Sequence, residues 1–224
     1  MKLTSIYEHM EKGAACVPEG ANCKIVFRHS IRGDIKDGTV GREVQLTNEG
    51  IELARSFGRG LDYCVGVVAS SSCERNVHTC REMLAGKQEE RANILIAPNE
   101  LEGQQTKDRY VSDKVFVDYN YRSDVIINKL VTAGLPGFNS IEKAAKIMLD
   151  FVFANGNGGN TVDMFCTHDF QMAILYAYLF DFTSSEEELK HNKWPMMLEG
   201  MIFWGDRNHF WCSWREQIKE FVDL

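Results

Sequence analysis

The chain has 224 residues, of which 44% are hydrophobic and 25% are charged, a balance typical of a soluble globular protein. Its net charge of −7 and its pI near 5.4 argue against a nucleic-acid partner, because a nucleic-acid-binding protein presents a basic face. No apolar run is long enough to cross a bilayer, and residues 1–20 lack the apolar core of a secretory signal. The seven cysteines are scattered and include no Cys-x-x-Cys pair, so we expect a reduced, cytoplasmic protein without a membrane partner.

Apolar runs and helical spacings alternate along the chain. The apolar spacing at the start of the chain predicts a short, peripheral amphipathic helix that ends near Gly13. Further helices are predicted at 47–59 with Thr47 as N-cap, at 77–84, at 141–154 with Ser140 as cap, and at 171–179. Buried strands are predicted at 24–27, 65–69, 94–97 and 162–166, and a hairpin at 201–214. This alternation predicts an α/β fold, a three-layer sandwich with a central, mainly parallel sheet.

Two segments interrupt the alternation. Residues 99–139 are irregular, mostly polar and dotted with aromatic side chains, and such a segment between core elements often forms a cap over a site. The polar loop at 183–195 is the second. Neither segment carries a strongly basic cluster, and the substrate is not readable from them. No linker divides the chain, so residues 1–224 are predicted to form one domain, whose oligomeric state the sequence leaves open.

Polar side chains gather where three of the predicted strands end. In an open α/β sheet, ligands bind in the crevice beyond the carboxyl ends of the strands. The residues at these positions are Arg28, His29 and Arg32 after the first strand, Arg75 after the second, and His168 and Asp169 after the fourth. Guanidinium forks and imidazoles suit a dianionic tetrahedral oxyanion. The sequence therefore predicts a phosphate site.

Such a site supports phosphoryl chemistry. A histidine at its centre can act as a nucleophile, because the flanking cations lower its pKa and stabilise charge in transit. The leaving alkoxide needs a proton, so a carboxyl group must lie close by as general acid. Asp169 is the nearest candidate in sequence, while Glu100 and Glu102 follow the third strand.

Four stretches, taken together and in this order, resemble the histidine phosphatase superfamily, which includes phosphoglycerate mutase-like enzymes and histidine acid phosphatases. They are residues 27–32, 46–50, 70–75 together with Thr79, and 167–169. The resemblance implies a phosphoglycerate mutase-like fold in which His29 becomes phosphorylated. It also implies a phosphate pocket made by Arg28, Arg32, Arg75 and His168, and hydrolysis of the phosphohistidine by water, without a metal or another cofactor.

The two branches of the superfamily differ in their proton donor. In the acid-phosphatase branch the donor is the Asp directly after the second His, which corresponds to Asp169. In the mutase-like branch it is a Glu on a loop after the second Arg motif, which corresponds to Glu100 or Glu102. Arg32 and Asp169 favour the first branch and the short chain favours the second, so we place Asp169 ahead of the two glutamates.

Two positions depart from the family pattern. Ser30 stands where the nucleophile is usually followed by Gly, and Asp34 stands where a Pro is expected. A Cβ at residue 30 is tolerated if the backbone φ is negative there. The serines at 70–72 are interpreted as turn formers that could also help to orient Arg75.

The sequence thus predicts hydrolysis of a small-molecule or protein phosphate monoester. One alternative is mutase-like transfer of the phosphoryl group to a sugar or glycerate acceptor. Another is a catalytically weak module that binds a phospholigand. Ser30, in place of the usual Gly, is the sequence feature that suggests this alternative. A metal-dependent phosphohydrolase with a His-Asp pair is disfavoured, because that class needs several further His and Asp ligands.

Overall fold

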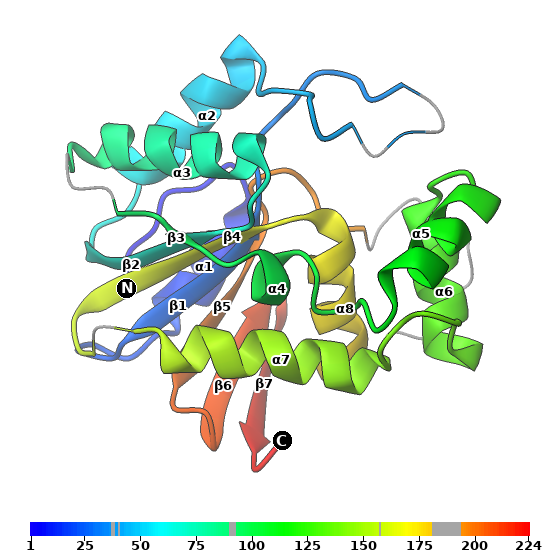
Figure 1. Cartoon of the computed structure of the whole chain (residues 1–224). Coiled ribbons are helices and arrows are strands. Elements are labelled where there is room, and N and C mark those ends of the chain that lie inside the picture. The colour runs from blue at the N-terminus through cyan, green and yellow to red at the C-terminus, as the bar shows by residue number, and fades with distance from the viewer. Residues whose placement is uncertain (37–38, 40, 90–92, 157, 181–193) are drawn as a thin grey trace.

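The computed structural model describes residues 1–36, 39, 41–89, 93–156, 158–180 and 194–224. A seven-stranded sheet with strand order β3-β2-β4-β1-β5-β6-β7 forms its centre, with helices on both faces (Figure 1). The strands are β1 Cys23–Arg28, β2 Cys64–Ser70, β3 Leu95–Ile96, β4 Thr161–Thr167, β5 Gly200–Gly205, β6 His209–Trp214 and β7 Gln217–Val222. Neighbours from β3 to β1 are parallel, whereas β5, β6 and β7 are each antiparallel to the preceding strand in this order. The sheet is therefore mixed.

Two hydrophobic clusters cover the two faces of the sheet. One contains apolar side chains of α1 (Glu8–Ala15), α2 (Asn48–Arg59) and α3 (Glu74–Lys87). The other contains those of α4 (Pro98–Leu101), α6 (Ser123–Ala133), α7 (Ile141–Ala154) and α8 (Asp169–Leu179). The remaining helix, α5 (Arg109–Asp118), pairs with α6 beside α8 (Figure 1).

The central strand β1 shows why the sequence gives this arrangement. All its residues are buried, and side chains alternate between the two faces of a strand. Ile25 and Phe27 accordingly pack in the α1–α3 cluster and Val26 packs in the opposite one. Because β1 and β4 are parallel with Arg28 opposite Thr167, the residues that follow the two strands emerge side by side.

Most of the predicted elements are confirmed, as is the α/β class with a covered sheet. The first helix is shorter than predicted at its start. It begins only at Glu8, because Leu3 pairs with Leu61 in a β-bridge. Residues 99–139 are not irregular but contain most of α4 and all of α5 and α6. Strand β7 was not predicted. His168 holds the N-cap position of α8, and Asp169 is the first residue of that helix.

Gly50 lets the start of α2 approach the backbone that follows His29. Thr47 caps α2 by accepting a hydrogen bond from Gly50 N, and a Cβ on Gly50 would lie 2.0 Å from Ile31 O. We expect Gly50→Ala to lower the free energy of unfolding by about 1–3 kcal/mol through overpacking, as measured by urea denaturation. Gly33→Ala is the control, because its Cβ would meet Val44 Cγ1 at an ordinary 3.4 Å. Equal effects of the two substitutions would contradict this account.

Candidate active site

His29 lies at the carboxyl end of β1 and is 2% exposed. Its backbone N–H donates to Thr167 O (3.1 Å), which joins it to the end of β4. The ring Nδ1 lies 2.8 Å from Ser30 O. A carbonyl oxygen can only accept, so Nδ1 carries the proton and Nε2 presents its lone pair. Burial, reinforced by His168 and Arg28, lowers the pKa of His29 well below the ordinary 6.5, so the ring is neutral at neutral pH.

The backbone after His29 is fixed by hydrogen bonds from elements distant in sequence. Ser30 N donates to Thr79 Oγ1 (3.1 Å) on α3, and Ser30 Oγ donates to Gly50 O (2.6 Å) on α2. Ser30 is buried and is not among the residues with positive φ. The Cβ at this position is therefore accommodated, and the side chain ties the loop after the nucleophile to α2.

Two buried arginines flank His29. Arg75, in the first turn of α3, donates from Nε to His29 Nε2 (3.3 Å) and from NH1 to Gly41 O (2.6 Å). Arg28 donates from NH1 to Pro195 O (2.7 Å) and pairs through NH2 with Asp169 Oδ2 (3.0 Å). Arg32 is half-buried, donates to Gly33 O (2.7 Å) and also lines the cavity. The three predicted guanidinium groups thus border one cavity.

His168 and Asp169 reach the same cavity from the end of β4. The two imidazole rings, of His29 and His168, meet edge to face with centroids 5.5 Å apart. Burial and the positive charge of Arg75 lower the pKa of His168 to about 4. Burial raises the pKa of Asp169, but the Arg28 guanidinium and the Trp194 indole N–H outweigh it and bring this pKa down to about 2. In the free protein Asp169 is therefore a carboxylate.

The two candidate glutamates differ in their position relative to the cavity. Glu102 lines the cavity, accepts from Ser72 Oγ (2.8 Å) and pairs with Arg42. Burial raises the pKa of Glu102, but His168, Ser72 and Arg42 together lower it by a larger amount. The net shift is downward, so Glu102 is also ionised. Glu100 is not among the cavity-lining residues that the structure describes.

Several site residues were missed in the sequence. Ser71 and Ser72 do more than form the turn. Ser71 Oγ accepts from Cys73 N (3.3 Å) and also lies 3.1 Å from His168 Nε2, and Ser72 Oγ donates to Glu102 Oε2 (2.8 Å). Gln171, in the first turn of α8, donates to Glu102 O (2.8 Å) and to Gln105 Oε1 (3.2 Å). Trp194 donates its indole N–H to Asp169 Oδ2 (3.1 Å). All of these are contacts between distant segments, and no local pattern in the sequence signals them.

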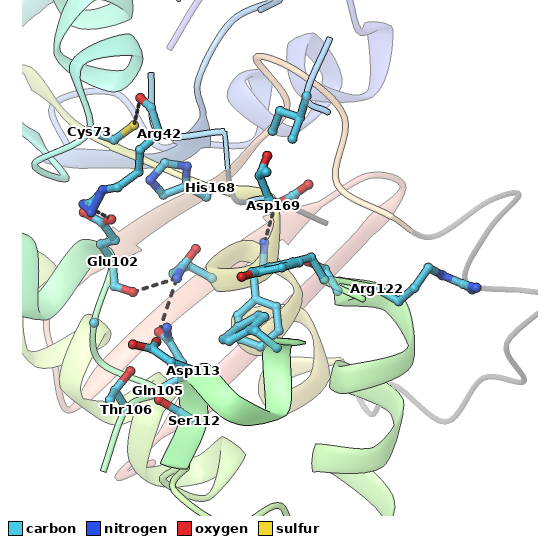
Figure 2. Close-up of a pocket in the computed structure, with 18 of the residues that line it drawn as sticks. Arg42, Cys73, Glu102, Gln105, Thr106, Ser112, Asp113, Arg122, His168 and Asp169 are labelled. Carbon is cyan, nitrogen blue, oxygen red and sulfur yellow. Dashed lines mark hydrogen bonds and ion pairs between the residues drawn. The ribbon is translucent and has the colours of Figure 1, made fainter. Parts of the chain in front are cut away.

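The cavity bounded by these residues has a volume of about 1280 Å³. Figure 2 shows His168 and Asp169 on one side of it and the paired Arg42 and Glu102 beside them, with Gln105 and Ser112 farther along the wall. Among the described lining residues are eight arginines and lysines but only four aspartates and glutamates. This local positive excess in a chain of net charge −7 favours an anionic ligand. The predicted loop at 183–195 lies outside the described residues, except for Trp194 and Pro195.

The lowered pKa of His168 makes stability depend on pH. Because its folded-state pKa of about 4 lies below the unfolded value near 6.5, protonation favours the unfolded chain. Neutral His168 therefore makes a contribution to the free energy of unfolding that is fully present above about pH 6.5 and is lost as the pH falls toward 4. We expect a loss of about 2 kcal/mol near pH 5 from this group, measured by urea denaturation in phosphate-free buffer. His168→Gln should flatten this part of the profile, and an unchanged slope in that variant would contradict the assignment.

Within the described residues, no group of three or more His, Cys, Asp or Glu side chains is arranged to hold a metal ion. No described helix is long and apolar enough to span a bilayer.

Known proteins resemble this chain in structure rather than in sequence. No protein-family model matches it, and a search of curated proteins found no match. A mycobacterial hydrolase superposes with a TM-score of 0.56 at 13% identity, over 92% of this chain and 90% of its own. Mycobacterial glucosyl-3-phosphoglycerate phosphatase superposes with a TM-score of 0.53 at 12% identity, over 91% and 100%. The complex of that phosphatase with inorganic phosphate gives a TM-score of 0.51, over 91% and 96%. The chain thus shares the fold of these solved proteins, which confirms the predicted phosphoglycerate mutase-like α/β fold.

Proposed function

We propose that this chain is a phosphatase that hydrolyses phosphate monoesters through a phosphohistidine at His29. The observation that carries the proposal is the neutral His29 Nε2 between two buried arginines, with His168 and Asp169 in the same cavity. A structural neighbour at 12% identity is a phosphatase that was solved with inorganic phosphate. Preorganised cations of this kind stabilise the charge of a transferring phosphoryl group.

In the first step, His29 Nε2 attacks phosphorus as the bond from phosphorus to the leaving oxygen breaks. Arg75 Nε, which donates to His29 Nε2 in the free protein, turns to a phosphate oxygen. Arg28, Arg32 and His168 hold the other oxygens. Asp169, a carboxylate in the free protein, takes up a proton from solvent when the dianionic ester binds. It gives this proton to the leaving oxygen, which departs as an alcohol.

In the second step, water attacks the phosphohistidine and transfers a proton to the Asp169 carboxylate. The bond between His29 and phosphorus breaks and inorganic phosphate leaves. His29 is then neutral again, and Asp169 releases its proton to solvent once the phosphate has left. No metal ion or other cofactor enters this scheme.

Asp169 is preferred as the donor because it shares Arg28 with the bound phosphoryl group and lies beside His29. A dianionic ester draws Arg28 away from the carboxylate and adds negative charge, and both effects raise the pKa of Asp169. Glu102 faces His168 and is fixed by Ser72 and Arg42 instead. Glu100 does not line the cavity in the described structure, so we no longer propose it.

We propose that residues 1–224 form one catalytic domain. In support, α1 near the start of the chain packs against β5 and β6 of the sheet that carries the site. We propose that residues 99–139 cap it. Tyr110, Phe116 and Arg122, on or near α5 and α6, line the cavity. On this proposal, the residues of this segment that line the cavity select among ester substrates.

Activity is expected to increase as the pH falls from about 8 to about 5. The lowered pKa of His29 keeps the nucleophile neutral in this range, whereas Asp169 needs a proton that acid supplies. The measurement is kcat/KM across this range, corrected for ionisation of the ester itself. A rate that rises steadily toward alkaline pH would contradict these roles.

The direct test of the proposed function is release of inorganic phosphate from a nitrophenyl phosphate and from alkyl phosphates in the presence of chelator. We expect turnover that the chelator leaves unchanged. Adding a sugar or glycerate acceptor separates hydrolysis from transfer, because a mutase-like protein would convert the acceptor to its phosphate ester. Binding of phosphate without turnover of any ester would overturn the proposal and leave a phospholigand-binding module.

A further inference from the structure

The segment 194–199 directly precedes β5 and contacts two of the proposed site residues, Asp169 and Arg28. Trp194 donates its indole N–H to Asp169 Oδ2 (3.1 Å), and Pro195 O accepts from Arg28 NH1 (2.7 Å). Its last residues also join the backbone of β1: Leu198 N donates to Arg28 O (3.1 Å), and Arg28 N donates to Glu199 O (3.0 Å). The position of this segment therefore affects both the carboxylate and the guanidinium group.

A buried ion pair holds the segment in place. Glu199 is 1% exposed, and its Oε1 accepts from Arg215 Nε (2.9 Å) while its Oε2 accepts from Met196 N (2.8 Å). Arg215 NH2 also donates to Trp194 O (3.1 Å). His9 Nε2 lies 3.0 Å from Glu199 Oε1 and adds a contact from α1. One guanidinium fork thus joins both ends of the segment, which a lysine ammonium cannot do with the same geometry.

Asp169 is fully engaged in the resting structure. Its Oδ1 accepts from Phe170 N (2.8 Å), and its Oδ2 accepts from Trp194 Nε1 (3.1 Å) and Arg28 NH2 (3.0 Å). When a bound phosphoryl group takes over Arg28, the indole N–H is the side-chain donor that still fixes the orientation of Oδ2. Rotation of a carboxyl group by a few tens of degrees is enough to spoil proton transfer to a leaving oxygen.

We propose that Trp194 is a positioning residue for Asp169, and that the Glu199–Arg215 pair holds the 194–199 segment so that it orients Asp169 and Arg28 together. This inference rests on the proposed function. Trp194 touches the donor rather than the substrate, so its effect depends on how far the reaction needs a proton on the leaving oxygen.

The test compares Trp194→Phe with the unchanged chain on two esters. An alkyl phosphate has a poor leaving group that needs the proton, whereas a nitrophenyl phosphate leaves readily without it. We expect kcat/KM, which reports phosphoryl transfer to His29 and not the later attack of water, to fall about tenfold for the alkyl ester, the cost of about 1.4 kcal/mol, and less than about twofold for the nitrophenyl ester. Trp211→Phe, a tryptophan on β6 stacked on Trp204, is the matched control. Equal losses on both esters, or no loss, would overturn the inference.

A second readout does not need turnover. The titration of Asp169, followed by NMR of its isotope-labelled carboxyl carbon, should shift to higher pH in Trp194→Phe, because the lost N–H stabilises the carboxylate. The charges around that carboxyl, on Arg28, His29 and His168, are the same in both proteins. Arg215→Lys keeps Glu199 paired and so avoids an unpaired buried charge, and it should shift the titration in the same direction by a smaller amount.

These outcomes separate the two proposals. If the unchanged chain hydrolyses neither ester, the phosphatase proposal fails, and the titration still decides whether Trp194 controls Asp169. If it hydrolyses both and the titration of Asp169 is the same in all variants, the phosphatase proposal survives and the positioning role of Trp194 is wrong.

Discussion

Replacing His29 with Gln is expected to reduce hydrolysis of phosphate monoesters by about 10⁴-fold or more. Gln is close to His in size and can accept from Arg75, but it has no nucleophilic ring nitrogen to form the phosphoryl intermediate. The cations around the site stay, so binding of inorganic phosphate should persist. Initial rates of phosphate release give the first result, and isothermal titration calorimetry gives the second.

His209→Gln is the matched control for this substitution. His209 is an exposed residue at the start of β6, where it pairs with Glu220 (2.7 Å), and its replacement should leave the rate unchanged. If His29→Gln kept more than a tenth of the activity while folding normally, another group would be the nucleophile and the proposed mechanism would be wrong.

Replacing Asp169 with Asn is expected to reduce kcat/KM for alkyl phosphates by about 10²–10⁴-fold, the usual contribution of a general acid. The reduction in kcat/KM should be much smaller for a nitrophenyl phosphate, because its leaving group departs without a proton. The same variant should bind inorganic phosphate more tightly, since it removes a carboxylate that competes for Arg28. Steady-state kinetics on the two esters and phosphate titration measure these effects.

The corresponding glutamate variants decide between the candidate donors. Glu102→Gln should lower the rate less than about tenfold, through the loss of its contacts with Arg42 and Ser72. Glu100→Gln should have no effect. A strong dependence on the leaving group in Glu102→Gln, with none in Asp169→Asn, would assign the donor role to Glu102 and with it the mutase-like arrangement.

The strand ends that make the site were predictable because local pattern and sheet geometry agree there. The apolar run from Lys24 to Phe27 and the run at 162–166 predict β1 and β4, and parallel pairing then brings His29 and His168 together. Local chemistry also predicted the caps at Thr47 and Ser140, which the structure confirms.

The cap segment was harder to predict because packing rather than pattern defines its helices. In α5, Ser112 is the buried residue, while Tyr110 and Val117 are 83% and 58% exposed. Its apolar stripe is short, because only Val115, Phe116 and Tyr119 pack against the core and all three are only partly buried. Its N-cap, Asp108, was a usable signal, since its side chain accepts from Val111 N.

The supporting residues of the site depend on tertiary contacts alone. Trp194 meets Asp169 across a sequence separation of 25 residues, and Arg42 meets Ser72 across 30. Nothing in the neighbouring sequence of either pair marks it. Strand β7 was missed for a different reason: it is an edge strand with mostly exposed side chains, and charged residues within it weaken the apolar alternation.

The most direct test of the central claim is to trap the intermediate. The protein is mixed briefly with a radiolabelled phosphate ester and quenched in alkali, in which phosphohistidine survives, and the labelled peptide is identified by mass spectrometry. The mechanism predicts acid-labile label on His29, none in His29→Gln, and more label in Asp169→Asn with a nitrophenyl ester, because the carboxylate that assists water is missing. Turnover without label on His29 in any of these proteins would contradict the phosphohistidine route.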